Sequence, residues 1–435
     1  MFGYYCNLAL RSFRRNKVLT ALMVLAIALG IGASMTTLTV FHILAGDPIP
    51  QKSDKLFYPR LEPRTARGQT PGEEPEEQMT RFDAEALLRE HRGDRQAMMS
   101  GGAVSVESAD GKIQPFAVDA RYTSADFFPM FDVPFAFGSG WTGADDEGRA
   151  QVAVISKELN EKLFGGGNSV GKTLRAGDNS FRIVGVLDTW RPTPKFYDLT
   201  NDRFSAVEQV FVPFSTSRAL KLGSQGNMDC WGDQTDAEGS TGLNAPCAWI
   251  QYWVELDDPS RAADYKRYLE NYSSQQRAAG RYQRPNNVRL RDVMEWLAFS
   301  KVVPNDVVMQ LWLAFGFLLV CLLNTVGLLL AKFMRREPEI GVRRALGASR
   351  RAVFAQYLVE AGAIGIVGAT AGLGLALLGL WAVRQQPDSY AELAHLDLPM
   401  LLATFALALI SSVLAGLLPA WRAMQVAPAI QLKSQ

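Results

Sequence analysis

The hydrophobic positions of this chain gather in four long runs, one near its start and three in its last third. Each run is at least as long as the roughly 20 apolar residues that a helix needs to cross a bilayer. The chain between the first two runs is polar and mixed, and is long enough for one or two domains with cores of their own. The pattern predicts a membrane α-helical protein with four transmembrane helices and a large α+β extracytoplasmic domain between helices 1 and 2. The expected spans are residues 18–45, 307–331, 352–383 and 398–418.

The short segments beside these spans predict the orientation. Four basic residues lie within residues 11–17, and seven more lie within residues 332–351. The loop at residues 384–397 has one arginine against three acidic residues. Because cytoplasmic loops are enriched in lysine and arginine, we expect both termini and segment 332–351 in the cytoplasm. Residues 46–306 and 384–397 are then expected on the outer side.

The first run follows a basic stretch, as the apolar core of a signal peptide does. It is too long for such a core and has no clear small-x-small cleavage site, so an uncleaved anchor is favoured. The preceding residues 1–17 combine Tyr5, Leu8 and Phe13 with basic side chains. This pattern favours an amphipathic helix on the inner membrane face, and a frayed basic tail is the alternative. Residues 419–435 are expected to form a cytoplasmic tail.

Local patterns within residues 46–306 predict an α+β domain. The β-branched run Val152–Ile155 is typical of a strand. The next segment, Lys157–Phe164, has helical spacing and ends at glycines. Residues 172–175 and 181–186 resemble a hairpin across a Gly-Asp-Asn turn. Further candidates are strands at Gln209–Pro213 and Trp249–Leu256, and an amphipathic helix at Arg261–Ala279.

One stretch of this region matches a nucleotide-binding pattern by its letters alone. Gly166–Thr173 reads Gly-Gly-Asn-Ser-Val-Gly-Lys-Thr, which fits GxxxxGK[ST]. That pattern cradles phosphate only when a strand precedes it and a helix follows. Here the expected order is reversed, and no Walker-B strand or ABC signature accompanies it. We therefore interpret the match as a glycine-rich turn between a helix and a strand.

The four cysteines divide by expected compartment. Cys6 would be cytoplasmic and Cys321 lies within the second span, whereas Cys230 and Cys247 lie in the outward region. An even pair in an oxidising compartment favours a disulfide that closes a long loop, and two free buried thiols are the alternative. No histidine lies near a cysteine or another histidine in the sequence, so no metal site is expected.

Composition excludes some classes of function. The chain of 435 residues has 45 Lys+Arg and 44 Asp+Glu, a net charge of +1, which suggests no nucleic-acid partner. Adjacent carboxylates such as Asp145 and Asp146 are typical of solvated turns. We find no arrangement of residues typical of a catalytic site and expect no catalytic residue in this chain.

Small and polar residues mark positions inside the spans. Gly30, and the pair Gly368 and Gly372, have spacings that permit close helix packing, although glycine is common in membrane helices. Asn324 and Glu360 are polar residues within spans two and three. An intramembrane acid is normally a candidate for function. We expect Glu360 near the cytoplasmic boundary, supporting the basic loop rather than carrying protons, because the spans hold no ladder of ionisable groups.

The basic loop itself carries the most specific motif, with Glu-Ile-Gly, Arg-Arg and Ala-Leu-Gly-Ala in succession within residues 336–351. It closely resembles the cytoplasmic coupling segment of ABC permeases of the FtsX-like, MacB-type family. Residues 125–140 and 154–186 resemble the periplasmic core domain of that family, and residues 418–432 resemble its usual ending. Trp421 departs from that ending, and the insertion from Cys230 to Cys247 has no counterpart that we can match.

The resemblance implies a permease subunit of an ABC exporter that works by mechanotransmission (a type VII ABC system). ATP and magnesium would be bound by a separate ABC ATPase, and this chain would bind no cofactor. The permease would form a homodimer or pair with a paralogous permease in the bacterial inner membrane. A periplasmic adaptor and an outer-membrane channel are further possible partners. The expected ATPase-coupling residues are Glu337, Glu339, Ile340, Gly341, Arg343, Arg344, Ala345, Leu346 and Gly347.

The substrates that the family suggests are peptides, lipopeptides, macrolide-like compounds or lipoproteins. The alternative is a non-transporting FtsX-like regulator of a periplasmic hydrolase or sensor. The size of the outward domain and its core-domain motifs favour export. The sequence alone names neither the substrate nor the ATPase.

Overall fold

The computed structural model describes residues 17–108, 113–233, 236–387 and 389–425. The chain divides into two compact units, Met1–Ala45 with Val303–Gln435, and Gly46–Val302. We call these the helical unit and the inserted domain. The amphipathic helix expected before the first span and the last residues of the expected tail lie outside the described residues.

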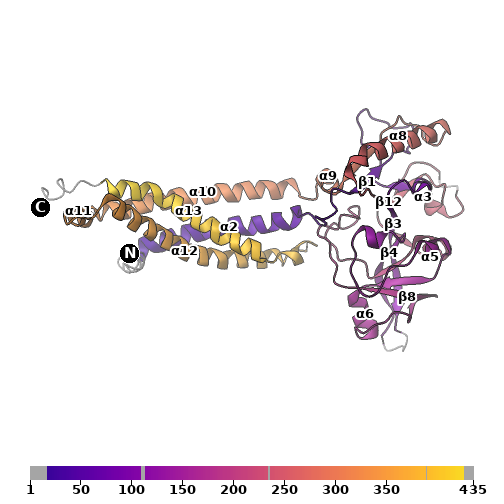
Figure 1. The fold of residues 1–435 in the computed structure, drawn as a ribbon, viewed down its shortest axis with the longest axis horizontal. Coiled ribbons are helices and arrows are strands. Elements are labelled where there is room, and N and C mark those ends of the chain that lie inside the picture. The colour runs from indigo at the N-terminus through magenta and orange to yellow at the C-terminus, as the bar shows by residue number, and fades with distance from the viewer. Residues whose placement is uncertain (1–16, 109–112, 234–235, 388, 426–435) are drawn as a thin grey trace. The chain divides into compact units, whose positions relative to one another are not determined.

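The helical unit contains four helices that are long and apolar enough to cross a membrane (Figure 1). They are α2 (Lys17–Ala45), α10 (Asn305–Met334), α12 (Arg350–Val383) and α13 (Leu398–Met424). A short helix, α11 (Glu337–Ala345), connects α10 to α12, and a 3₁₀ turn, η3 (Ala391–Leu393), lies between α12 and α13. With the inserted domain between α2 and α10, the predicted fold class is confirmed.

Helix α2 lies against α10, α12 and α13, and small residues allow the close approach. Ser34 Oγ of α2 donates a hydrogen bond to the backbone oxygen of Ala314 in α10 (3.1 Å). The three glycines predicted to pack helices all lie at such contacts. A Cβ atom added to Gly30 would lie 2.8 Å from Leu318 Cδ1. One added to Gly368 would lie 2.7 Å from Ile27 Cγ2, and one added to Gly372 would lie 3.0 Å from Ile31 Cβ.

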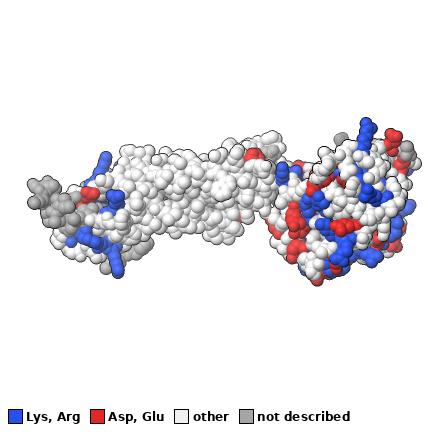
Figure 2. All heavy atoms as spheres, turned by 90° about the horizontal axis from the view of Figure 1, so that it is seen from above, with Lys and Arg blue, Asp and Glu red and all other residues white. Residues whose placement is uncertain are grey.

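The outer surface of the helical unit is apolar along the spans. On the face that Figure 2 shows, charged side chains of this unit lie only towards its ends. Exposed side chains of α10 and α13 include Trp312, Leu313, Leu402 and Ile410. Such a surface is stable against lipid but not against water, which is the reason for treating these helices as membrane-spanning.

The inserted domain is built on one mixed sheet of 13 strands, with helices packed against it (Figure 1). Its main path runs β13-β1-β12-β3-β4-β9-β6-β8-β5, and only the β4–β9 and β6–β8 pairs are parallel. The strands are β1 (Leu56–Arg60), β2 (Met79–Thr80), β3 (Arg95–Glu107), β4 (Phe116–Thr123), β5 (Phe135–Gly138), β6 (Val152–Ile155), β7 (Thr173–Ala176), β8 (Asn179–Leu187), β9 (Val210–Pro213), β10 (Ser224–Gln225), β11 (Asp229–Cys230), β12 (Cys247–Glu255) and β13 (Arg289–Asp292).

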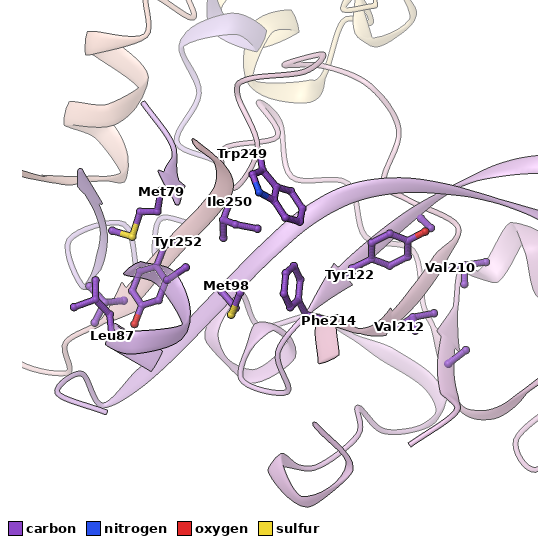
Figure 3. Packing of buried hydrophobic residues seen from close by; sticks show 14 of the residues in the cluster. Met79, Leu87, Met98, Tyr122, Val210, Val212, Phe214, Trp249, Ile250 and Tyr252 are labelled. Carbon is purple, nitrogen blue, oxygen red and sulfur yellow. The ribbon is translucent and has the colours of Figure 1, made fainter. Parts of the chain in front are cut away.

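Seven helices and two 3₁₀ turns complete the described part of the domain. Its main core joins side chains of the sheet to those of the covering helices, and Figure 3 shows Met98 and Phe214 among the side chains of this core. The elements are α3 (Arg81–Glu90), α4 (Phe127–Met130), α5 (Gly143–Glu147), α6 (Lys157–Phe164), α7 (Phe214–Ala219), η1 (Gly239–Thr241), η2 (Pro259–Arg261), α8 (Ala262–Ala278) and α9 (Val293–Phe299).

Several local predictions agree closely with these elements. Strand β6 and helix α6 have the expected bounds, and the strands predicted near residues 210 and 250 are β9 and β12. The GxxxxGK[ST] match lies between the end of α6 and the start of β7, so a helix precedes it and a strand follows. Gly166 and Gly171 have φ angles of +82° and +85°, which a glycine adopts without strain. The interpretation as a glycine-rich turn is confirmed.

A buried ion network holds the irregular segment 188–209 against the sheet. Arg121 of β4 forms ion pairs with Asp198 (2.6 Å) and Glu208, and Lys195 also reaches Glu208 (3.1 Å). Burial alone would raise the pKa of Glu208, but Arg121 and Lys195 lower it to about 2. Because each charge has an opposite partner, the network tolerates its loss of water and ties the segment to one position.

Candidate coupling site

The coupling segment, residues 332–351, contains the helix α11, whose ends suit the helix dipole. Pro338 lies in the first turn with Glu337 and Glu339, and Arg343 and Arg344 lie in the last. Proline is favoured at a helix start, and carboxylates there and cations at the end are favourable electrostatically. The pattern of acidic residues followed by two arginines, which resembles the family's motif, therefore also favours a short helix by its local electrostatics.

The Ala-Leu-Gly-Ala part of the motif ends this helix. Gly347 has a φ of +101°, and its N–H donates to the backbone oxygen of Arg344 (3.1 Å). The N–H of Ala348 donates to the backbone oxygen of Arg343 (3.1 Å). These two bonds form a Schellman motif, which favours glycine at this position. Ser349 then caps α12, because its Oγ accepts from the N–H of Ala352 (3.2 Å).

One face of α11 is buried and another is open. Ile340 and Gly341 are buried against the helical unit. Val342 and Leu346 are 54% and 84% exposed, and Arg343 is also exposed. Exposed large apolar side chains beside a cation are the chemistry of a protein-binding surface.

Glu360 of α12 lies directly beneath the coupling segment. Its carboxylate forms an ion pair with Lys332 Nζ at the end of α10 (2.7 Å) and a longer one with Arg336 (3.6 Å). The side chains of Lys332 and Glu360 are 0% and 3% exposed. A buried pair of this kind is costly to break, so it fixes the end of α10 to α12.

Aromatic and polar contacts continue this attachment. The rings of Phe333 in α10 and Tyr357 in α12 lie 4.1 Å apart. Arg343 donates to Gln356 Oε1 of α12 (3.1 Å), and Arg344 donates to the backbone oxygen of Met424 in α13 (3.4 Å). The coupling segment therefore contacts α12 and α13 through its own charged side chains.

The nine predicted coupling residues thus share one helix and its cap. Glu360 lies beside them, as its expected supporting position requires, and the sequence analysis did not single out Lys332 as its partner. Asn324 is elsewhere: it lies on the exposed side of α10, whereas its neighbour Thr325 is buried and donates to the backbone oxygen of Cys321 (2.8 Å). Cys230 and Cys247 lie in the inserted domain, joined by a disulfide.

The sequence matches two domain families that together span most of the chain. Residues 20–272 match the MacB-like periplasmic core domain, and residues 311–428 match the FtsX-like permease C-terminal domain. The chain belongs to the MacB-type, FtsX-like permease family. The permease assignment made from the coupling motif is confirmed.

Two relatives with similar sequences are longer than this chain. It is 26% identical over 430 residues to the pyoverdine export ATP-binding/permease protein PvdT of Pseudomonas entomophila, covering 97% of this chain and 58% of that protein. It is 24% identical over 443 residues to the macrolide export ATP-binding/permease protein MacB of Rhodospirillum rubrum, covering 100% of this chain and 61% of that protein. The chain therefore spans about three-fifths of these relatives.

A solved structure shows a weaker likeness. The periplasmic region of MacB from Actinobacillus actinomycetemcomitans is 12% identical, with a TM-score of 0.37, and covers 57% of this chain and 94% of that one.

Proposed function

We propose that this permease is the membrane subunit of an ABC exporter driven by a separate ATPase. The observation that carries the proposal is α11, a short helix with an exposed basic and apolar face that is fixed to the ends of two membrane helices. An ATPase would bind the face formed by Val342, Arg343 and Leu346. The basic character of the segment supports its expected cytoplasmic side, where ATP is available.

Movement of α11 would pass through the contacts beneath it. The Lys332–Glu360 pair and the Phe333–Tyr357 contact join the end of α10 to α12. Helix α12 packs in turn against α2. Helix α2 ends at Ala45, where the inserted domain begins, and α10 starts at Asn305, just after that domain ends. Helices α2 and α10 therefore join the helical unit, which includes α11, directly in the chain to the domain that would act outside.

This arrangement supports mechanotransmission rather than conduction through the spans. Apart from the Lys332–Glu360 pair beside α11, the described buried part of the helical unit is filled by apolar and small side chains, including Ile27, Ile31 and Ala376. A polar substrate would find only scattered hydroxyls to compensate for its loss of water along such a path. We propose that the inserted domain moves substrate on the outer side, in the range of compounds that the names of the relatives suggest, such as siderophores and macrolides.

The test is ATP hydrolysis by the permease co-expressed with its ABC ATPase. Arg343→Glu/Arg344→Glu reverses two charges on α11, and like-charge contacts at an interface cost several kcal/mol. We expect loss of co-purification or at least about a tenfold fall in permease-dependent hydrolysis. Arg350→Glu/Arg351→Glu changes the loop charge equally at exposed positions outside α11 and should retain most coupling. Equal losses in both variants would show that only net charge matters and would overturn the coupling role.

A further inference from the structure

The inserted domain has a cleft that the coupling proposal does not use. It has a volume of about 340 Å³ and lies between α3, α5 and α7, above the sheet. Leu88, Met98 and Phe214 give it an apolar floor, and Arg81, Asp146 and Arg218 are among its polar walls. Its size and mixed lining are those of a site for a small ligand, since such sites range from about 300 to 1,000 Å³.

Arg218 of α7 is the unusual residue of this cleft. Its Nε donates to Ser217 Oγ (3.3 Å) and its Nη2 to the backbone oxygen of Leu222 (2.6 Å), so the side chain is held in place. Three rings surround its guanidinium, with Trp249 at 5.5 Å and Tyr122 and Phe214 at 5.8 Å each. Within the described part of the chain, no carboxylate forms an ion pair with it. Burial lowers the pKa of Arg218 and Arg81 lowers it further, whereas Tyr122 and Glu238 act in the opposite direction.

Four carboxylates line the cleft, and none of them forms an ion pair with Arg218 in the described structure; Glu147 lies at the wall beside Asp146, and the other three have partners of their own. Glu85 and Glu238 both pair with Arg81, at 2.7 and 2.6 Å. Asp146 accepts hydrogen bonds from the N–H of Ala125 (2.7 Å) and from Trp141 Nε1 (2.8 Å). Arg218 is therefore a half-buried cation that no carboxylate of the cleft contacts directly, although Glu238 acts on it from a distance. A half-buried cation held by rings, a hydroxyl and one carbonyl is a favourable position for an anion that arrives from outside.

One wall of the cleft comes from the loop between Cys230 and Cys247. The disulfide between Cys230 and Cys247 closes this loop at its base. From the loop, Glu238 and the backbone oxygen of Thr241 both accept from Arg81 Nη1, at 2.6 and 3.2 Å. The loop thus adds a second acidic partner for Arg81, and in the described structure its Glu238 pairs with Arg81 rather than with Arg218.

We propose that this cleft binds an amphipathic carboxylate. The carboxylate pairs with Arg218, and the apolar part of the ligand lies against Leu88, Met98 and Phe214. Arginine suits this role because its planar fork binds carboxylates with two parallel hydrogen bonds. The site belongs to the inserted domain alone, so it stands whether or not α11 couples to an ATPase.

The test uses a pair of probes that differ only in charge, N-acetyl-4-fluorophenylalanine and its primary amide. Fluorine NMR of the full-length permease in lipid nanodiscs measures the binding of each. We expect the carboxylate to bind about tenfold more tightly than the amide, as one charged hydrogen-bonded contact predicts. Arg218→Gln should bring carboxylate binding down to that of the amide, and Arg218→Lys should restore part of the preference. Arg277→Gln, at an exposed arginine of α8 that does not line the cleft, should change nothing.

Other outcomes are equally decisive. Equal binding of acid and amide by the wild type, or no binding of either, would exclude the site for this class of ligand. A preference that survives Arg218→Gln would place the anion elsewhere. If Arg218→Gln disturbs folding, amide binding is lost as well, and the wild-type preference with the Arg218→Lys result then decides. Loss of ATPase coupling is not expected in any of these variants, so failure here is distinct from failure of the proposed function.

Discussion

Lys332 and Glu360 form an ion pair of 2.7 Å in which both side chains are almost completely buried. Lys332 lies in the last turn of α10 and Glu360 lies two to three turns into α12, so the pair joins the two membrane helices on either side of α11. Breaking one partner of a buried pair leaves an uncompensated charge, which typically costs about 3–5 kcal/mol. Replacing both partners by apolar residues removes that cost.

These energies predict an ordered series of variants. Lys332→Met and Glu360→Gln should each lower the thermal unfolding temperature of the permease in nanodiscs, with Glu360→Gln more damaging because after Lys332→Met the carboxylate keeps Arg336 as a partner. The double variant Lys332→Met/Glu360→Leu should recover most of the stability. If the pair also transmits motion, the double variant should still show reduced ATPase coupling. A double variant as unstable as the worse single variant would contradict this account.

The packing of α2 against α12 predicts different effects for two neighbouring glycines. A Cβ atom added to Gly372 would lie 3.0 Å from Ile31 Cβ, whereas one added to Gly374 would have no neighbouring atom within 4 Å. Gly372→Val should therefore force the helices apart, at a cost of about 1–3 kcal/mol, and lower the unfolding temperature. Gly374→Val on the same helix serves as the control and should change it little. Similar losses in both variants would mean that valine acts through helix propensity rather than through packing.

Much of this architecture could be predicted from the sequence because it depends on local patterns. Hydropathy located the four spans, and the helix and strand at residues 152–164 follow from their spacing and from the glycines that end them. The coupling motif also encodes its own structure, since Gly347 takes the positive φ that a Schellman cap needs. These features require no knowledge of distant contacts.

Features that depend on distant residues could not be predicted. In the sequence, Lys332 is one of seven basic residues that predict the cytoplasmic side of segment 332–351. Only the contact between α10 and α12 identifies it as the partner of Glu360. Asn324 was expected to support the bundle, yet its helical phase places it on the exposed side of α10. Arg218 carries no motif at all, because its surroundings come from α3, β3, β4 and β12. The spacing of residues along the sequence does not show that these separate elements meet around Arg218.

Two adjacent carboxylates of α5 should respond to pH with opposite sign. Burial raises the pKa of Asp146 to about 6, despite its two hydrogen bonds, whereas the N–H and hydroxyl of Thr142 lower that of Asp145. A raised pKa means that the protonated form favours the fold. Its contribution is complete below about pH 4, the unfolded value, and is lost as pH rises through about 6.

Unfolding of the full-length permease between pH 4 and pH 7 checks this sign. Two pKa units correspond to about 3 kcal/mol at most, which solvent access reduces. Relative to Asp146→Asn, the wild type should therefore lose stability as the pH rises from 4 to 7. Extending the range below pH 4 tests Asp145: relative to Asp145→Asn, the wild type should lose stability as the pH falls below about 4, because a lowered pKa stabilises the fold above the unfolded value. The same pH trend in both variants would show that charge on α5 acts only collectively.

The disulfide between Cys230 and Cys247 should stabilise the inserted domain through the loop that it closes. For a sequence separation of 17, the loss of chain entropy in the unfolded state corresponds to about 3 kcal/mol. Cys230→Ser/Cys247→Ser should therefore lower the unfolding temperature, and a reductant should do the same to the wild type but not to the double serine variant. Cys321→Ala, at the buried free thiol of α10, is the control and should leave the reductant effect intact. If reduction leaves the wild type unchanged, the contacts of Arg81 with Glu238 and Thr241 hold the loop without the disulfide.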